Sequence, residues 1–350
     1  LAERLLQAAD RGVRVRLLVD DMGFGGTDEG LASADSHPNI EVRVFNPLAN
    51  RSKSLWNFLF DFDRVNHRMH NKILVTDNSF AIVGGRNIGN HYFGVNPETN
   101  FRDLDIAAVG PIVRDISTVF DHFWASEVAV PVSVLVDRDF TKQDFNNLIL
   151  SVRERIDLGT YPYSVEHEIE AAHEVMSEAE SRLIWAPGSI VWNSPEKSMD
   201  DEKGSEMIAA LKRKLKQVDR SFMIESAYFV VSDFGVSEME RLIENGVDVR
   251  VLTNSLASND VLAAHAGHAE YRKQLIKAGV EMYELRPDSG VIKKDWIGES
   301  RAGLHTKAMV FDEESLFIGS FNLDPRSANI NTEAGLYVES PELARVLLLY

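Results

Sequence analysis

The chain reads HNKILVTDNSFAIVGGRN from residue 70 to residue 87 and HTKAMVFDEESLFIGSFN from residue 305 to residue 322. Both stretches place histidine, lysine, aspartate, glycine and asparagine at the same offsets, and both contain apolar runs typical of strands. One such match is more often structural than catalytic, but two copies in register are not expected by chance. The pattern therefore predicts a duplicated fold in which each half supplies part of one shared site.

The duplication extends upstream of both motifs. Residues 11–18 resemble residues 245–252, and in each copy a helical pattern ends at a glycine before a run of β-branched residues. Helical and strand patterns then alternate, which predicts an α/β fold with a mixed, largely parallel sheet in each half. The second copy has an additional strand before its first helix, residues 222–229, for which the first copy has no counterpart.

We expect three segments: a first half (1–135), a connecting insertion (136–205) and a second half (206–350). The insertion is rich in Glu, Asp and Ser and has no partner elsewhere, so we interpret it as a connection that also forms a lid. The chain opens at Leu1 partway into a helical pattern, which suggests a fragment whose N-terminal anchor or export signal is unseen.

Composition narrows the possible functions. The 350 residues include no cysteine, which excludes disulfides, thiolate metal sites and a cysteine nucleophile. The formal net charge of −17 disfavours a protein that grips nucleic-acid backbone without sequence preference. No apolar run is long enough to predict a transmembrane helix.

The repeated residue types suit phosphodiester chemistry. Alternate residues of a strand point to the same side, so the histidine and lysine of each motif share a face. One imidazole can attack phosphorus while the other protonates the departing alcohol, and ammonium and amide groups can hold the non-bridging oxygens. The pattern predicts a covalent phosphohistidine and requires neither metal nor cofactor. The predicted catalytic residues are His70, Lys72, Asn87, His305, Lys307 and Asn322.

Other positions have supporting roles. Each imidazole needs a carboxylate to orient it, and the candidates are Asp103 and Glu333, both at the starts of apolar strands. The motif aspartates are expected to make structural hydrogen bonds or ion pairs rather than to touch substrate. The predicted structural positions of the motifs are Asp77, Asp312, Gly84, Gly85, Gly319 and Ser320.

The double motif resembles that of the phospholipase D superfamily. The longer strings at residues 68–72, 84–89, 252–260 and 319–327 are similar to bacterial cardiolipin synthases of the C type. The resemblance implies a pseudo-dimer of two fused α/β/α halves with one active site at their interface. It departs at His91, where these proteins tend to have an acidic residue.

The resemblance also implies roles and substrates. His70 would be the nucleophile and His305 the acid, each oriented by a carboxylate of the opposite half, which pairs His70 with Glu333 and His305 with Asp103. The implied reaction transfers a phosphatidyl group to phosphatidylglycerol, giving cardiolipin, with phosphatidylethanolamine as donor. The implied location is the surface of the bacterial inner membrane, as a peripheral protein, with an accessory protein left open.

Two questions stay open on the sequence. The apolar cluster Trp56, Phe58, Leu59 and Phe60 predicts either a contact with lipid or an ordinary buried helix. The same catalytic residues would also serve a phospholipase or a nuclease that uses water as acceptor, because exclusion of water depends on pocket shape. A non-catalytic module that binds lipid or phosphate is the alternative from another class.

Overall fold

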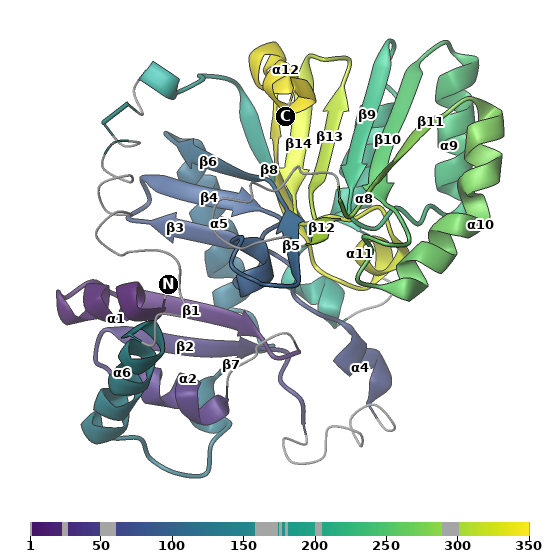
Figure 1. Cartoon of the computed structure of the whole chain (residues 1–350). Helices are drawn as coiled ribbons and strands as arrows, with labels where there is room; N and C mark the ends of the chain where they lie inside the picture. Colours follow the sequence, from purple (N-terminus) through teal and green to yellow (C-terminus); the bar gives the residue numbers. More distant parts are fainter. Residues whose placement is uncertain are drawn as a thin grey trace. The chain divides into compact units, whose positions relative to one another are not determined.

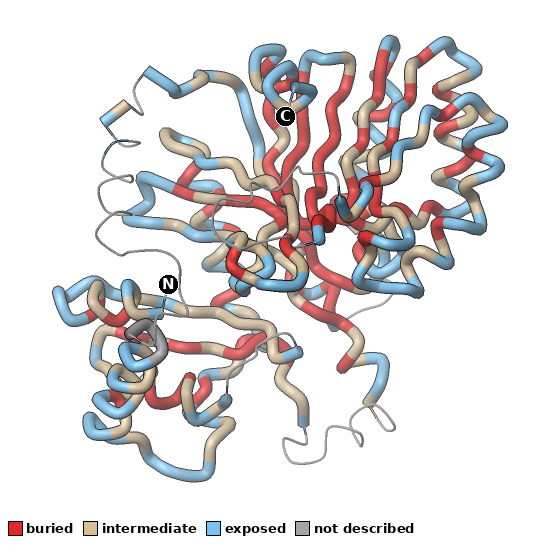
Figure 2. The backbone as a smooth tube through the Cα atoms, viewed as in Figure 1, coloured by how far each residue is buried: buried red, intermediate tan, exposed pale blue. Residues whose placement is uncertain are grey.

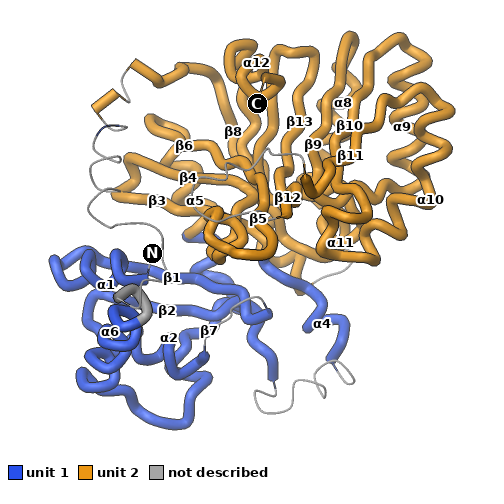
Figure 3. The backbone as a smooth tube through the Cα atoms, in the orientation of Figure 1, with its two compact units in different colours: residues 1–69, 121–175 blue, residues 70–120, 176–350 orange. Residues whose placement is uncertain are grey.

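The computed structural model describes residues 2–22, 27–49, 61–157, 174, 177–178, 181–199, 205–288 and 301–349. The chain separates into two compact units (Figure 3). Unit 1 contains residues 1–69 and 121–175, and unit 2 contains residues 70–120 and 176–350. Both copies of the motif belong to unit 2. The boundaries predicted at residues 135 and 206 stay a prediction. They follow the sequence repeat, whereas the two compact units group residues that pack together.

Unit 1 is built around a three-stranded sheet with the order β1-β2-β7. Strands β1 (Val15–Asp20) and β2 (Ile40–Phe45) are parallel, and β7 (Ala129–Pro131) is antiparallel to β2. Val42 and Val44 alternate with polar residues along β2 and pack in the core of the unit. Its helices are α1 (Ala2–Asp10), α2 (Asp28–Asp35), α4 (Phe62–Asn66), α6 (Lys142–Asp157) and the short η2 (Val132–Val134).

The main sheet of unit 2 has the order β11-β10-β9-β13-β14-β15-β8 (Figure 1). Neighbours from β11 to β9 are parallel, whereas every neighbouring pair from β9 to β8 is antiparallel. Figure 2 shows β13 and β14 buried along their whole length, since both faces of the sheet are covered. The strands are β8 (Gly188–Trp192), β9 (Ser221–Ser226), β10 (Asp248–Asn254), β11 (Glu281–Leu285), β13 (Lys307–Phe311), β14 (Ser315–Gly319) and β15 (Ala334–Val338).

A second sheet of unit 2 comes from the first copy and repeats part of this order. Strands β3 (Ile73–Thr76), β4 (Phe80–Gly84) and β6 (Asp105–Val109) form an antiparallel sheet that corresponds to β13-β14-β15. Ala81 and Val83 of β4 pack against apolar residues of β13, β14 and β15. The two copies therefore meet through equivalent strands. A parallel pair, β5 (Thr99–Arg102) with β12 (Arg301–Leu304), joins them a second time.

Helices complete unit 2. On one face of the main sheet, Met207 of α8, Leu242 of α9 and Leu275 of α10 pack in one core with Met309 and Phe311 of β13. On the other face, α12 packs with the first-copy sheet. The helices are α5 (Ile112–Trp124, which continues into unit 1), α8 (Glu206–Leu215), α9 (Asp233–Glu244), α10 (Leu262–Ala278), α11 (Pro325–Asn329), α12 (Pro341–Leu349) and the short η1 (Asn90–Tyr92) and η3 (Pro195–Ser198). None of the described helices is long and apolar enough to cross a bilayer.

The expectation of a largely parallel sheet is wrong. Antiparallel pairs predominate because each motif strand turns back directly into the next strand. The turns contain Asp77 and Asn78 in the first copy and Asp312 and Glu313 in the second, all four with positive φ. Aspartate and asparagine tolerate this left-handed conformation, so the motif aspartates lie at the tight turns of two antiparallel hairpins.

The absence of a first-copy counterpart for residues 222–229 has a structural consequence. In the second copy, β9 lies between β10 and β13 and joins the parallel and antiparallel parts into one sheet. No described strand of the first copy takes this place. Its strands therefore belong to separate sheets, with β1-β2-β7 in unit 1, β3-β4-β6 in unit 2, and β5 paired with β12.

The segment 136–205 is only partly a connection. Its strand β8 pairs along its whole length with β15, so this part belongs to the main sheet. Residues 195–198 follow as η3, in which Lys197 and Ser198 are buried. These described residues support a structural role and give no support to a lid.

Candidate active site

Main-chain hydrogen bonds between the two copies place the motif histidines. The N–H of His70 donates to the carbonyl oxygen of Thr332 at 3.0 Å, and the N–H of His305 donates to that of Arg102 at 2.8 Å. In both cases the residue that follows the accepting carbonyl group carries one of the predicted carboxylates. Each histidine is thus attached to the opposite copy directly beside an acidic side chain.

The predicted pairs of histidine and carboxylate lie within hydrogen-bond distance. Nδ1 of His70 is 2.9 Å from Oε2 of Glu333, and Nδ1 of His305 is 2.6 Å from Oδ2 of Asp103. Glu333 and Asp103 are 0% and 3% exposed, so both are removed from water. Neither Nε2 has a hydrogen bond to the described residues, which leaves this nitrogen of each ring for a ligand.

The motif lysines bend back toward their own histidines. Nζ of Lys72 donates to the carbonyl oxygen of His70 at 2.6 Å, and Nζ of Lys307 donates to that of His305. Lys307 is buried, and its desolvation lowers the pKa to about 8 although Asp103 opposes the shift. Two ammonium groups in one poorly solvated site favour the binding of an anion.

The asparagines lie in different surroundings. Nδ2 of Asn87 donates to the hydroxyl of Tyr92 at 2.8 Å, whereas Oδ1 of Asn322 is buried without a partner among the described residues. A buried amide oxygen that lacks a partner can accept a hydrogen bond from a donor group of a ligand. The Tyr92 ring also stands edge-on to His305, with centroids 4.8 Å apart. No motif signalled Tyr92, because the tyrosine has no counterpart in the second motif.

The two carboxylates differ in their hydrogen bonds. Glu333 accepts from the hydroxyls of Ser320 and Ser327, the latter at 2.7 Å, in addition to His70. Burial opposes ionisation of Glu333, but His70 and these hydrogen bonds, together with Lys72, outweigh it and lower the pKa. Glu333 is therefore ionised at neutral pH. Its carboxylate can only accept hydrogen bonds, so Nδ1–H of His70 is the donor.

Asp103 has fewer partners. Its Oδ1 accepts the N–H of Leu104 at 2.9 Å, and the position equivalent to Ser320 is Gly85, which offers no hydroxyl. Burial raises the pKa of Asp103 to about 6, against the opposing effect of Lys307. The site is therefore nearly symmetric in geometry but asymmetric in charge.

The pKa values of both histidines lie below the ordinary value. Desolvation is the main cause for His70, partly offset by Glu333. For His305 desolvation acts together with the positive charges of Lys307 and Lys72, and the pKa falls well below its usual range. Without a bound anion, both rings are neutral at pH 7.

Two residues of the connecting segment hold the loop that carries Glu333, and neither was predicted as a site residue. The main-chain N–H of Asn193 donates to the carbonyl oxygen of Glu333 at 2.9 Å, and its Oδ1 accepts the N–H of Glu333 at 3.1 Å. Buried Lys197 donates to the carbonyl oxygen of Asn331 at 2.7 Å and contacts those of Ser327 and Ala328 at 3.3 Å. Desolvation lowers the pKa of Lys197 to about 8. These residues lie outside the repeat, so no motif signalled them.

The remaining motif positions have packing or backbone functions. A Cβ at Gly84 would lie 2.0 Å from Oδ1 of Asp105, and one at Gly319 would lie 2.5 Å from the carbonyl oxygen of Ala334. These glycines therefore permit the close approach of neighbouring strands. The carboxylate of Asp312 accepts main-chain N–H groups at the start of β9, the shortest at 2.7 Å from Arg220.

Some expectations lie away from this cluster. His91 is exposed, with Nδ1 2.9 Å from the carbonyl oxygen of Thr99, and belongs to neither pair. Among the described residues no group of three or more His, Cys, Asp or Glu could hold a metal ion. The proposed lipid contacts Trp56, Phe58, Leu59 and Phe60 lie outside the described residues.

Known proteins share this arrangement of repeats. The family model described as "Cardiolipin synthase, PLD-like domain" matches residues 1–124 and 211–348. The chain belongs to this family. Cardiolipin synthase C of Escherichia coli (strain K12) is 39% identical over 352 residues, which cover 99% of this chain and 74% of that protein. The family assignment confirms the resemblance to the phospholipase D superfamily.

Two further proteins extend the comparison. An uncharacterized protein of Helicobacter pylori (strain ATCC 700392 / 26695) is 33% identical over 348 residues, 99% of this chain and 69% of its own. The crystal structure of phosphatidylserine synthase from Haemophilus influenzae Rd KW20 aligns with a TM-score of 0.58 at 16% identity, covering 99% of this chain and 82% of that one. This likeness confirms the predicted fold, a phospholipase D-like pseudo-dimer of mixed α/β halves.

Proposed function

We propose that the chain is a phosphatidyltransferase that makes cardiolipin from phosphatidylglycerol and a second phospholipid. The observation that carries this proposal is the pair of histidines, each bonded through Nδ1 to a buried carboxylate of the opposite copy. The names of the cardiolipin synthases to which the chain is similar support the choice of reaction. Phosphatidylethanolamine is the proposed donor.

In the first step, Nε2 of His70 attacks the phosphorus of the donor. A P–N bond forms and the bond between phosphorus and the headgroup oxygen breaks, while Nε2–H of His305 protonates that oxygen. Neutral His70 keeps its lone pair on Nε2 because ionised Glu333 accepts from Nδ1. The proposed ligands of the non-bridging oxygens are Lys72, Lys307, Asn87 and Asn322.

In the second step, His305 acts as the base. It removes the proton from a hydroxyl of phosphatidylglycerol, whose oxygen attacks phosphorus as the P–N bond breaks. The products are cardiolipin and free His70. His305 must be protonated before it can act as the acid of the first step, although its pKa is low when no substrate is bound. The negative charge of the bound phosphodiester offsets Lys307 and Lys72 and raises the pKa of His305 on binding.

The substrates define the partners and the location that we propose. Both lipids are bilayer components, so the protein acts at a membrane surface, as a peripheral protein of the bacterial inner membrane. The net charge of −17 supports lipid over nucleic acid as the source of the phosphodiester. An accessory protein is compatible with this proposal but not required by it.

A product assay in vesicles of phosphatidylethanolamine and phosphatidylglycerol tests the reaction, with lipids resolved by mass spectrometry. We expect cardiolipin and free ethanolamine, both lost on His70→Ala or His305→Ala. Phosphatidic acid without cardiolipin would replace the transferase with a phospholipase. Cleavage of oligonucleotides in preference to lipids would instead indicate a nuclease.

A further inference from the structure

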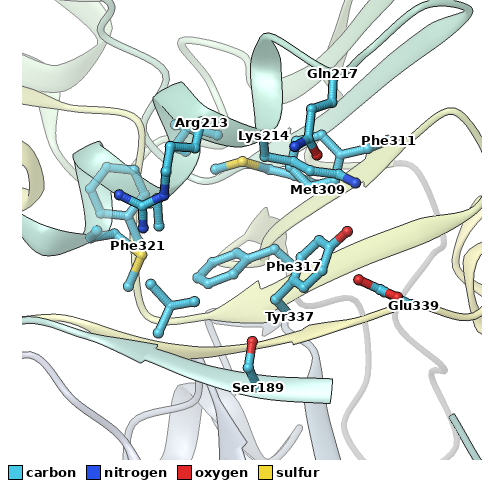
Figure 4. Close-up of a pocket in the computed structure, with 14 residues that line it drawn as sticks. Ser189, Arg213, Lys214, Gln217, Met309, Phe311, Phe317, Phe321, Tyr337 and Glu339 are labelled. Carbon is cyan, nitrogen blue, oxygen red and sulfur yellow. The ribbon is translucent and has the colours of Figure 1, made fainter. Parts of the chain in front are cut away.

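A cavity of about 320 Å³ lies between helix α8 and the half of the main sheet that runs from β13 to β8 (Figure 4). None of the predicted catalytic residues lines it. The strands that form its floor are β13, β14, β15 and β8, and α8 covers it from the other side. The cavity is thus a concave site in unit 2 that is separate from the paired histidines.

The floor of the cavity is apolar and largely aromatic. Phe311, Phe317, Phe321 and Tyr337 contribute rings, and Figure 4 shows the rings of Phe317 and Tyr337 near the centre of the cavity. Met207 and Leu211 of α8, together with Met309 and Val191, complete the apolar lining. Such a surface favours a hydrocarbon chain because removal of apolar area from water stabilises binding.

The rim of the cavity carries two cationic side chains. Arg213 and Lys214, at the C-terminal end of α8, form no ion pair with the described residues. Nζ of Lys214 lies 5.1 Å from the ring centroid of Tyr337, which places its charge over the aromatic floor. Glu339 and Ser189 line other parts of the cavity, and Figure 4 shows Glu339 apart from Arg213. Figure 4 shows the Arg213 side chain beside Phe321, apart from Lys214, which lies beside Phe311 and Tyr337. In a chain with a net charge of −17, cations on both sides of the rim point to an anionic ligand.

The cavity adjoins the second motif along two paths. Lys307, Met309 and Phe311 are alternate residues of β13, so the catalytic lysine shares a strand face with the cavity floor. Phe321 lines the cavity and stands between Ser320 and Asn322 in the sequence. A chain bound in the cavity would therefore lie directly behind the motif.

We propose that this cavity binds a fatty acid, with the acyl chain against the aromatic floor and the carboxylate at Arg213 on the rim. The volume is near the lower end of the range for ligand pockets, which suits one chain and not a two-chain phospholipid. The site goes beyond the proposed reaction, because its ligand does not react and occupies none of the catalytic residues.

Titration calorimetry with dodecanoate, below its critical micelle concentration, tests the proposal on the full chain. We expect saturable binding of one dodecanoate and at least about tenfold weaker binding of dodecyltrimethylammonium, which has the same chain and the opposite charge. Arg213→Glu should weaken dodecanoate binding by about tenfold. Lys212→Glu is the matched control on the same helix, because Nζ of Lys212 lies 4.1 Å from the ring centroid of Phe234 and outside the cavity.

A second variant tests the apolar part. Leu211→Trp fills the cavity without a change of charge and should abolish binding while circular dichroism shows an intact fold. Equal binding of the two surfactants, equal effects of the Arg213 and Lys212 variants, or no saturable binding would each overturn the proposal. The assay involves no turnover, so its result is independent of whether the chain makes cardiolipin.

Discussion

Nζ of Lys197 lies 2.7 Å from the carbonyl oxygen of Asn331, two residues before Glu333. Lys197 belongs to the segment between the two copies, whereas Glu333 orients the proposed nucleophile of the first copy. The same ammonium contacts the carbonyl oxygen of Ser327, whose hydroxyl donates to Glu333. A lysine outside the repeat thus holds the backbone that leads to the carboxylate serving His70.

Replacement of this lysine should weaken catalysis through Glu333. Lys197→Met keeps most of the side-chain volume but leaves buried carbonyl oxygens unpaired, at a cost of about 1–3 kcal/mol in the free energy of unfolding. We expect kcat to fall by about 10–10²-fold with little change in KM, because misplacement of the His70 pair affects the transition state. Lys216→Met, at an exposed position after α8, is the control. Equal kcat values for the two variants would remove Lys197 from this role.

The glycine of the first motif should not tolerate a side chain. A Cβ at Gly85 would lie 2.7 Å from Oδ1 of Asp103 and 3.0 Å from Cδ of Lys307. Gly85→Ala should therefore displace the partner of His305 and lower kcat by about 10²-fold. At Gly89 the nearest atom would be 3.6 Å away, so Gly89→Ala should retain activity. Steady-state assays of both variants provide the comparison, and an active Gly85→Ala enzyme would contradict the observed packing.

The two histidines should give different products when replaced. With an aryl phosphodiester, whose leaving group needs no acid, His305→Ala should complete the first step and accumulate the adduct on His70. The second step lacks its base and should be slower by about 10²–10⁴-fold. His70→Ala should form no adduct. Intact-protein mass spectrometry separates these outcomes, and an adduct in the His70 variant would reverse the assigned roles.

The rate should depend on pH in a bell shape. Below about pH 6 Asp103 is protonated and no longer stabilises the imidazolium of His305, so kcat/KM should fall on the acid side. Above about pH 8 Lys307 loses its proton, so anion binding should weaken on the alkaline side. In the Asp103→Asn variant, the residual kcat/KM should no longer fall below about pH 6. A profile that is flat from pH 5 to 9 would show that neither group titrates in the free enzyme.

Binding of an anion should be accompanied by uptake of protons. The charge of a bound phosphate offsets the cations that lower the pKa of His305, so the ring takes up a proton at neutral pH. Calorimetry of inorganic phosphate in buffers of different ionisation enthalpy measures the number of protons. His305→Ala should bind with less uptake, and identical uptake by the variant and the parent would assign the proton to another group.

Several features of the fold followed from the sequence. The apolar runs of the two motifs predicted strands, and the structure forms β3 and β4 within the first motif and β13 and β14 within the second. The in-register repeat indicated that His70 and His305 act together. The direction of the strands was predicted wrongly, because the short turns after each motif strand form antiparallel hairpins whatever the order of helices elsewhere.

The sequence by itself indicated the duplicated fold and the residue types of the two motifs, since a pattern repeated in register records both. The two carboxylates are not in register and were predicted from their place at the starts of apolar strands. Only the tertiary structure decided that Glu333 is ionised while burial raises the pKa of Asp103, and that Asn193 and Lys197 hold the Glu333 loop. The physical reason is that charge and hydrogen bonding depend on neighbours in space. The Glu333 carboxylate and its loop are held by residues from three segments, namely Ser320, Ser327 and Lys197. No spacing in the sequence indicates that these residues lie close together.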